Sequence, residues 1–174
     1  MPRFLQAIAI ALGLTMLAGA ATAQQWRLST EGYGPARLGM TVDDAALALG
    51  VKLAVIDPLI FDDPGCLYVT PEPDIAGLLI MVSDGIVVRF DVSSGGAIKT
   101  RSGLGIGDSE EKVMSVLGPA VAVQPHFYGG LPDHYLTIWS ADHKSAVRFE
   151  TDKGKVARFY AGLDPQVTYV EGCF

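Results

Sequence analysis

Three histidines offer the most obvious chemistry in the chain, because they fall within eighteen residues of one another. They are His126, His134 and His143, and Asp133 and Asp142 each precede one of them. Imidazole and carboxylate groups are ordinary zinc ligands, so a small metal-dependent hydrolase is one interpretation of this segment. The spacing matches no zinc-ligand pattern, and an extended chain turns the two members of each Asp-His pair to opposite faces. We therefore interpret the histidines as loop and turn residues and expect no metal and no cofactor.

A glycine-rich stretch, Gly105-Ile-Gly-Asp-Ser109, invites comparison with a phosphate loop or a serine nucleophile. It lacks the lysine of a P-loop and the G-x-S-x-G pattern of a nucleophile elbow. Ser109 instead suits the N-cap of a helix, since Glu110 and Glu111 follow where acids favour the helix dipole. No spaced carboxylate pair and no Cys/His pair stands out. We do not expect an enzyme.

The strongest candidate for binding is a predicted sheet face rich in aromatic and arginine side chains. Strand alternation places Phe90 and Phe159 toward the core, together with Val88 and Ala157. The outward face then carries Arg89, Tyr135, Thr137, Trp139, Arg148, Glu150, Arg158 and Tyr160. Tyrosine, tryptophan and arginine are enriched at interface hot spots, so this face predicts a partner-binding surface. The alternative is that these residues only cover an open sheet with cross-strand pairs.

The elements that must position this face occur twice. The stretch 34–50 resembles 103–119, and Gly39 falls on Gly107 at an offset of 68 residues. The hairpin segment Gly85–Phe90 matches Gly154–Phe159 at an offset of 69. Each copy predicts a short helix followed by three or four antiparallel strands, and neither copy could bury its sheet alone. We predict an α+β fold: a tandem repeat with helices on one face of one continuous sheet. Its parts are 1–23 as a signal peptide, 24–97 as the first repeat and 98–174 as the second.

The first 23 residues indicate export. Arg3 precedes an apolar run without acid or base, and Ala21-Thr22-Ala23 forms a small-residue cleavage site. The run is shorter than the roughly 20 residues that a spanning helix needs, and no cysteine follows the site for lipid attachment. We expect a periplasmic protein with no membrane span after the leader. The net charge of −6 argues against nucleic acid as a partner.

Cys66 and Cys173 are the only cysteines, and an even number in an exported chain favours a disulfide. This bridge would tie an extended C-terminal tail, 166–173, to the first half of the chain. It would close a loop worth roughly 4–5 kcal/mol in the chain-entropy model.

Short motifs also resemble known families. Gly39-Met40-Thr41 followed by Leu49-Gly50 is similar to the helix of the SmpA/OmlA class of outer-membrane assembly lipoproteins. Two such units in tandem resemble the β-lactamase-inhibitor-protein fold, which implies a joined sheet with a concave face for a partner. The ending Tyr169-Val-Glu-Gly-Cys173 resembles a group of uncharacterised exported bacterial proteins. Inhibitor activity is not implied, because no inhibitor contact residue matches.

These observations favour a non-catalytic periplasmic binding or inhibitor-like module whose partner is a periplasmic protein or a cell-wall component. An envelope-assembly accessory is the alternative that the lipoprotein resemblance implies.

Overall fold

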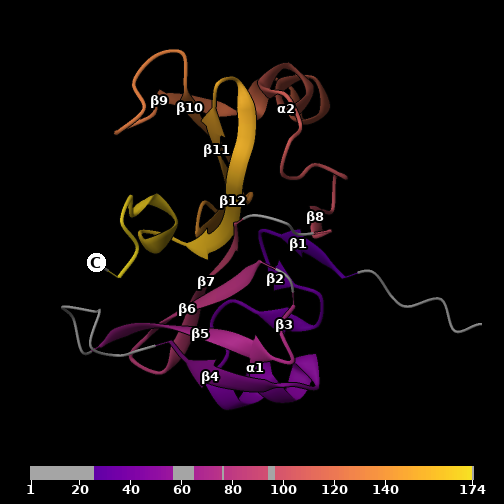
Figure 1. The fold of residues 1–174 in the computed structure, drawn as a ribbon, viewed down its shortest axis with the longest axis vertical. Helices are drawn as coiled ribbons and strands as arrows, with labels where there is room; N and C mark the ends of the chain where they lie inside the picture. Colours follow the sequence, from indigo (N-terminus) through magenta and orange to yellow (C-terminus); the bar gives the residue numbers. More distant parts are fainter. Residues whose placement is uncertain (1–25, 57–64, 76, 94–96, 174) are drawn as a thin grey trace, which may run out of the picture.

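Two sheets and two short helices form a mostly-sheet α+β fold in the computed structural model, which describes residues 26–56, 65–75, 77–93 and 97–173 (Figure 1). The predicted signal peptide, 1–23, lies outside the described residues. Within the described residues, no helix is long and apolar enough to cross a membrane. The elements are β1 (Arg27–Ser29), β2 (Gly32–Tyr33), β3 (Ala36–Arg37), α1 (Val42–Leu49), β4 (Lys52–Val55), β5 (Cys66–Glu72), β6 (Leu78–Ser83), β7 (Ile86–Ser93), β8 (Lys99–Thr100), α2 (Glu110–Leu117), η2 (Gly118–Ala120), β9 (Ala122–Pro125), β10 (His134–Trp139), β11 (Ser145–Asp152), β12 (Lys155–Leu163) and η3 (Gln166–Thr168).

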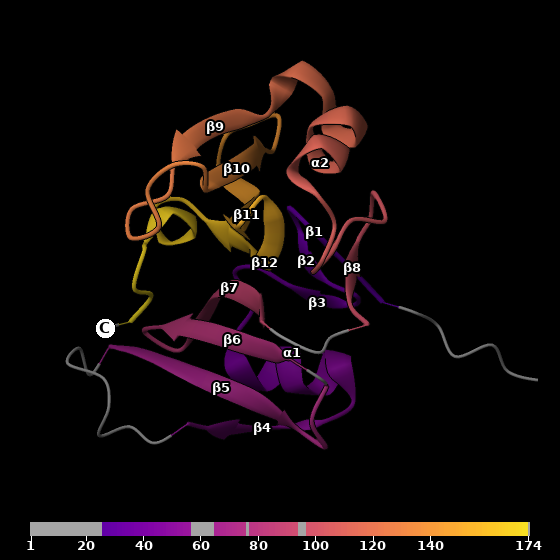
Figure 2. The same cartoon turned by 45° about the horizontal axis from the view of Figure 1, so that its top comes forward.

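The larger sheet has eight antiparallel strands in the order β4-β5-β6-β7-β12-β11-β10-β9. The last strand of each half lies in the middle, where β7 pairs with β12 and Phe90 faces Ala161. Figure 2 shows the consequence: β4 to β7 form the lower part of the view and β9 to β12 the upper part. The β7–β12 pair is therefore the seam between the two halves.

A second sheet, in the order β3-β2-β1-β8, was not expected. Strands β1 and β8 pair with each other in parallel, with Leu28 opposite Thr100. Arg101 N donates to Leu28 O at 2.8 Å, and the Leu28 side chain is fully buried. Burying Leu28 against both halves favours this pairing, which a strand-by-strand sequence analysis cannot reveal.

One main core cluster takes side chains from both halves of the chain. Phe90 of β7 belongs to it with Phe149 and Phe159, whose rings stack with centroids 5.7 Å apart. Ala45 of α1 and Val113 of α2 are fully buried in the same cluster. Each buried phenylalanine contributes roughly 2–3 kcal/mol relative to its exposed state.

The helix start predicted at Ser109 is confirmed, and Thr41 takes the same role in the first half. Thr41 Oγ1 accepts a hydrogen bond from Asp44 N at 3.2 Å, and Ser109 Oγ accepts one from Lys112 N at 3.2 Å. Each hydroxyl satisfies one backbone donor of the first helical turn that has no partner within the helix.

Two β-bulges correct the faces predicted for Val88 and Ala157. In each hairpin the register shifts two residues before the phenylalanine, which leaves one extra residue in β7 and one in β12. Val88 packs in a second cluster, away from Phe90, and Ala157 is exposed. Val87 and Val156 take the core positions instead. A bulge shifts the period-two pattern by one residue, so alternation alone cannot detect it.

Two other segments differ from the sequence prediction. Strand β9 was not predicted, because all of its side chains are exposed at the sheet edge and carry no alternation. The C-terminal tail does not start extended: it starts with the 3-10 turn η3 and is then held by backbone contacts.

Candidate binding groove on the second face of the sheet

The eight predicted face residues do lie on one side of the large sheet, opposite the main core. The register aligns them in three rows of direct cross-strand neighbours. These rows are Tyr135–Glu150–Arg158, Thr137–Arg148–Tyr160–Asp91 and Trp139–Ala146–Gly162–Arg89–Met81–Tyr68. We call this surface, with Tyr68 and Asp91 included, the polar face.

The expectation that the polar face is open to solvent was wrong. Trp139 is half-buried, and Arg158 keeps 52% of its side chain exposed. The other six predicted residues are buried, namely Arg89, Tyr135, Thr137, Arg148, Glu150 and Tyr160. Their predicted binding role is therefore limited to what the covering segments leave accessible.

The C-terminal tail is one of those covering segments. Val167 of η3 is fully buried against Tyr160 and beside Trp139, and the Cys66–Cys173 disulfide joins the end of the tail to β5. A Cβ added to Gly172, whose φ is +71°, would lie 2.4 Å from the Tyr68 hydroxyl. Only glycine fits this close approach, so the tail packs closely against the sheet at this residue.

Arg89 connects the tail to the sheet. Its Nη1 donates to Gln166 O and to Tyr169 O, both at 3.0 Å, and its Nη2 donates to the Tyr68 hydroxyl at 2.6 Å. Nε and Nη2 also reach the two carboxylate oxygens of Asp91, each at 2.9 Å. Such a two-pronged contact is the strong form of an ion pair.

Burial and charge act against each other at this ion pair. Burial by itself lowers the pKa of Arg89, but Asp91 and Tyr68 outweigh it and raise that pKa overall. Burial raises the pKa of the Asp91 carboxyl, and the facing guanidinium opposes that rise. The pair therefore depends on both partners being present, since either charge alone would be buried without compensation.

Glu150 is the second centre of the polar face. Its carboxylate accepts from the Tyr160 hydroxyl at 2.9 Å and lies 2.8 Å from Arg158 Nε and 3.4 Å from His126 Nε2. Burial raises the pKa of Tyr160, and the Glu150 charge adds to that rise. The phenol is thus held as a neutral donor.

Arg148 is bound differently from the other arginines of this face. Its guanidinium carbon lies 4.0 Å from the centre of the Tyr135 ring. Among the described residues no carboxylate lies within salt-bridge distance of it, and its buried Nε and the neighbouring Thr137 Oγ1 have no hydrogen-bond partner. The stacking on Tyr135 is therefore its main contact.

The loop 126–133 covers the other side of the polar face, and it carries functional candidates that the sequence analysis missed. His126 stacks on Tyr135 with centroids 4.5 Å apart and accepts from Gly129 N at 2.9 Å. The loop also leaves three large apolar side chains exposed, by 72%, 63% and 78%: Phe127, Tyr128 and Leu131. Two adjacent aromatics beside a Gly-Gly pair in a loop were the available signal.

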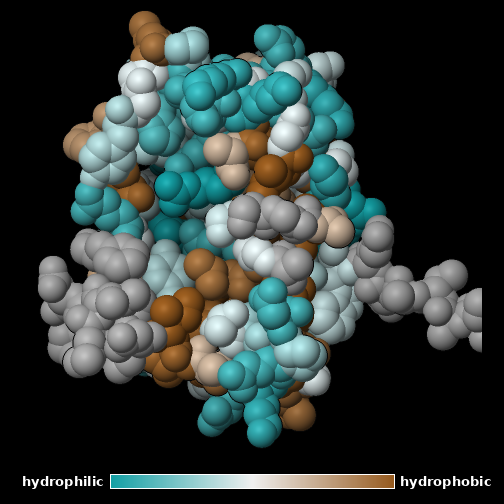
Figure 3. Space-filling view, in the orientation of Figure 1, coloured by the Kyte–Doolittle hydropathy of each residue, from teal (hydrophilic) through white to brown (hydrophobic). Residues whose placement is uncertain are grey.

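A groove of roughly 670 Å³ lies between this loop, the tail and the first half of the sheet. Its floor includes Arg89, Asp91 and Arg158. Ile56 and Leu79 line it from the first half of the chain, where Leu79 is the direct cross-strand neighbour of Asp91. Tyr128, Val170 and Glu171 line it from the loop and the tail. The Tyr128 hydroxyl bonds to the Glu171 carboxylate, which links the loop to the tail. Figure 3 shows hydrophobic surface near the middle and lower left of the view, with mostly hydrophilic surface above it and at the bottom.

The three histidines are separated by their partners. His126 faces Glu150, His134 Nδ1 lies 2.9 Å from Glu110 Oε1, and His143 stacks on Trp139. Within the described residues, no group of three or more His, Cys, Asp or Glu side chains could hold a metal ion.

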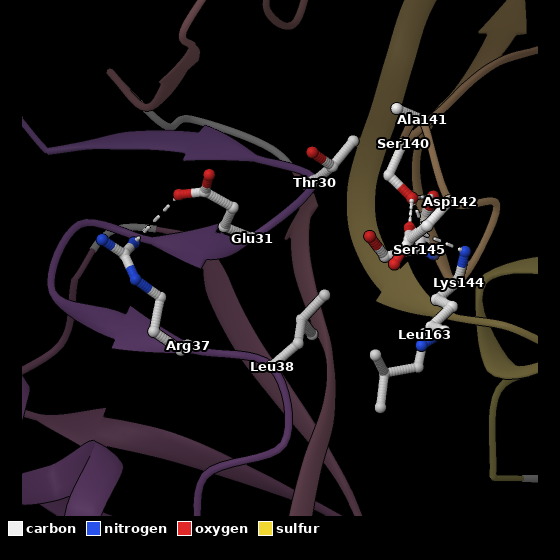
Figure 4. A pocket seen from close by; sticks show the side chains of 10 residues that line it. All are labelled: Thr30, Glu31, Arg37, Leu38, Ser140, Ala141, Asp142, Lys144, Ser145 and Leu163. Carbon is white, nitrogen blue, oxygen red and sulfur yellow. Dashed lines mark hydrogen bonds and ion pairs between the residues drawn. The ribbon is translucent and has the colours of Figure 1, made fainter.

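A second cleft, of roughly 600 Å³, lies between the small sheet and the β10–β11 turn (Figure 4). Its polar groups bond to near neighbours on their own side: Ser140 Oγ donates to Asp142 at 2.8 Å, and Arg37 lies 4.0 Å from Glu31. The cleft has no apolar wall comparable to that of the groove, so the groove is the better candidate site.

No protein-family model, no curated protein and no solved structure matches the chain. The resemblances to the SmpA/OmlA class and to the β-lactamase-inhibitor-protein fold therefore stay predictions.

Proposed function

We propose that this protein is a non-catalytic, exported binding module whose groove binds a partner protein. The observation that carries the proposal is the exposed aromatic rim of the groove. Tyr128 lines the groove and is 63% exposed, and Tyr169, which lines an adjoining pocket together with Tyr128, is 42% exposed. Both belong to segments that are anchored on the sheet. Large aromatic side chains held in place at low entropic cost are typical binding anchors.

Matched contacts support the tandem repeat. Gly39 N donates to Val87 O at 2.8 Å, and its counterpart Gly107 N donates to Val156 O at 2.9 Å. The two bulges lie 69 residues apart, which is the offset of the hairpins in the sequence. Both helices contribute to the same core cluster, which favours their lying on one face of the sheet. The polar face, on the opposite side of the sheet, would then be the side that binds the partner.

The disulfide supports export. Cys66 and Cys173 are 107 residues apart in sequence, with Cα atoms 5.4 Å apart. Disulfides that tie down a structural segment persist in oxidising compartments, so this bridge fits a periplasmic location after removal of residues 1–23.

Site-specific photo-crosslinking tests the proposed function. A photoreactive amino acid at Tyr128 should give a discrete adduct in living cells, and the same probe at Leu47, which is 83% exposed on α1, should give none. Adding Tyr169→Ala should weaken the adduct, because Tyr169 lines the adjoining pocket together with Tyr128. Equal labelling from both positions would contradict a binding groove.

A further inference from the structure

The groove has a definite charge pattern. Arg89 and Asp91 satisfy each other on its floor, and the remaining donors of Arg89 bind Tyr68 and the tail backbone. Glu171 on the rim bonds to the Tyr128 hydroxyl. Arg158 is different, because it contacts Glu150 through Nε while 52% of its side chain stays exposed. Arg158 is therefore the cation that the described lining of the groove presents to a ligand.

Arg158 also has a polar neighbour across the seam. Ser93 of β7 is its direct cross-strand partner, and both residues line the groove. A guanidinium beside a hydroxyl suits a carboxylate, which accepts from both at once. The polar part of the floor is thus a small site for an anion.

Apolar side chains from both halves of the chain line the groove together with this polar spot. Ile56 and Leu79 come from the first half, and Tyr128 and Val170 come from the loop and the tail. A cation, a hydroxyl and apolar side chains that line one groove suit neighbouring side chains of one peptide better than a lone ion. A peptide with an acidic side chain beside an apolar one would contact both the polar and the apolar lining of the groove.

We infer that the groove binds a peptide segment in which an acidic side chain stands next to an aromatic or aliphatic one. The carboxylate contacts Arg158 and the apolar side chain packs against Tyr128 and Val170. This inference rests on the proposed function and adds the chemistry of the partner. The chain itself carries a net charge of −6, so an acidic partner is repelled elsewhere and is favoured at this cation.

A displayed library of random short peptides, selected on the full-length disulfide-bonded protein, tests the inference. Peptides retained by the wild type should be enriched in Asp or Glu next to an aromatic or aliphatic residue. Replacing the acid of a selected peptide by its amide should weaken binding about fivefold on the wild type. The same replacement should change nothing on Arg158→Gln, while Arg158→Lys should keep part of the preference.

Arg101→Gln is the matched control, because Arg101 is also an exposed arginine paired with one glutamate, at 3.4 Å from Glu31. It should keep the full acid preference. Selected peptides without acids that still lose binding on Tyr128→Ala would overturn this inference and leave the proposed function standing. A selection that yields no peptide dependent on Tyr128 or Arg158 would also overturn it, and photo-crosslinking would then decide the function separately.

Discussion

At the scale of single residues, the three arginines of the polar face have different environments. Arg89 is paired with Asp91 on two atoms, and Arg158 is paired with Glu150 and half exposed. Arg148 is buried over an aromatic ring without a described carboxylate partner. Removing each charge should therefore have a different effect on stability, even though residue type and strand position are similar.

Replacing Arg89 by methionine should lower the free energy of unfolding by about 3–5 kcal/mol, because Asp91 would stay buried without its partner. Replacing Arg148 by methionine should change it by less than about 1 kcal/mol, because no described carboxylate loses its partner. Urea unfolding of both variants measures the difference. Equal losses of unfolding free energy would contradict the prediction that no carboxylate depends on Arg148.

Alkaline pH should destabilise the fold through buried tyrosines. Burial raises the pKa values of Tyr160 and Tyr68 in the folded state above the usual value of about 10. Their contribution is complete below that value and is lost as the pH rises toward the folded pKa values, because the unfolded chain ionises first.

Tyr160→Phe should therefore reduce the slope of unfolding free energy against pH above pH 10 by up to about 1.4 kcal/mol per pH unit, the effect of one proton. Urea unfolding at a series of alkaline pH values gives both slopes. An unchanged slope would show that the Tyr160 hydroxyl ionises equally in the folded and unfolded chains.

At the scale of elements, the helices could be predicted from the sequence because their signals are local. Thr41 and Ser109 each stand before an amphipathic turn, and the hydrogen bonds of a cap involve only the next few residues. We expect Thr41→Ala and Ser109→Ala each to cost about 1 kcal/mol in thermal or urea unfolding. Ser115→Ala removes the same hydroxyl from an exposed position inside α2 and should not destabilise.

A loss from Ser115→Ala equal to that from Ser109→Ala would contradict capping as the cause. The two cap variants should also behave alike if the halves are true repeats.

Other elements could not be predicted, since their causes are distant in sequence. The sequence assigned the Phe90 and Phe159 faces correctly, but the bulges at Val88 and Ala157 depend on register with the neighbouring strand. The pairing of β1 with β8 joins segments about seventy residues apart. The candidate site was predicted least well. Alternation identified the residues of the polar face, but their burial depends on where the tail and the loop 126–133 lie.

At the scale of the whole molecule, the C-terminal tail links the second half of the chain back to the first half. Cys173 at the end of the second half is bonded to Cys66 on β5 of the first half, and Arg89 of β7 binds the tail between them. The tail therefore crosses the seam where β7 and β12 pair. In this position it covers the polar face and forms one wall of the groove.

Replacing Cys66 and Cys173 by alanine should lower the free energy of unfolding by about 4–5 kcal/mol, because the bridge closes a long loop in the unfolded chain. In the folded state the tail should stay in place, held by the Arg89 bonds and by buried Val167. The cost of Arg89→Met should then be the same, within about 0.5 kcal/mol, with or without the disulfide. If Arg89→Met costs much less in the double-alanine background, the disulfide itself holds the tail on the sheet and the groove wall exists only in the oxidised protein.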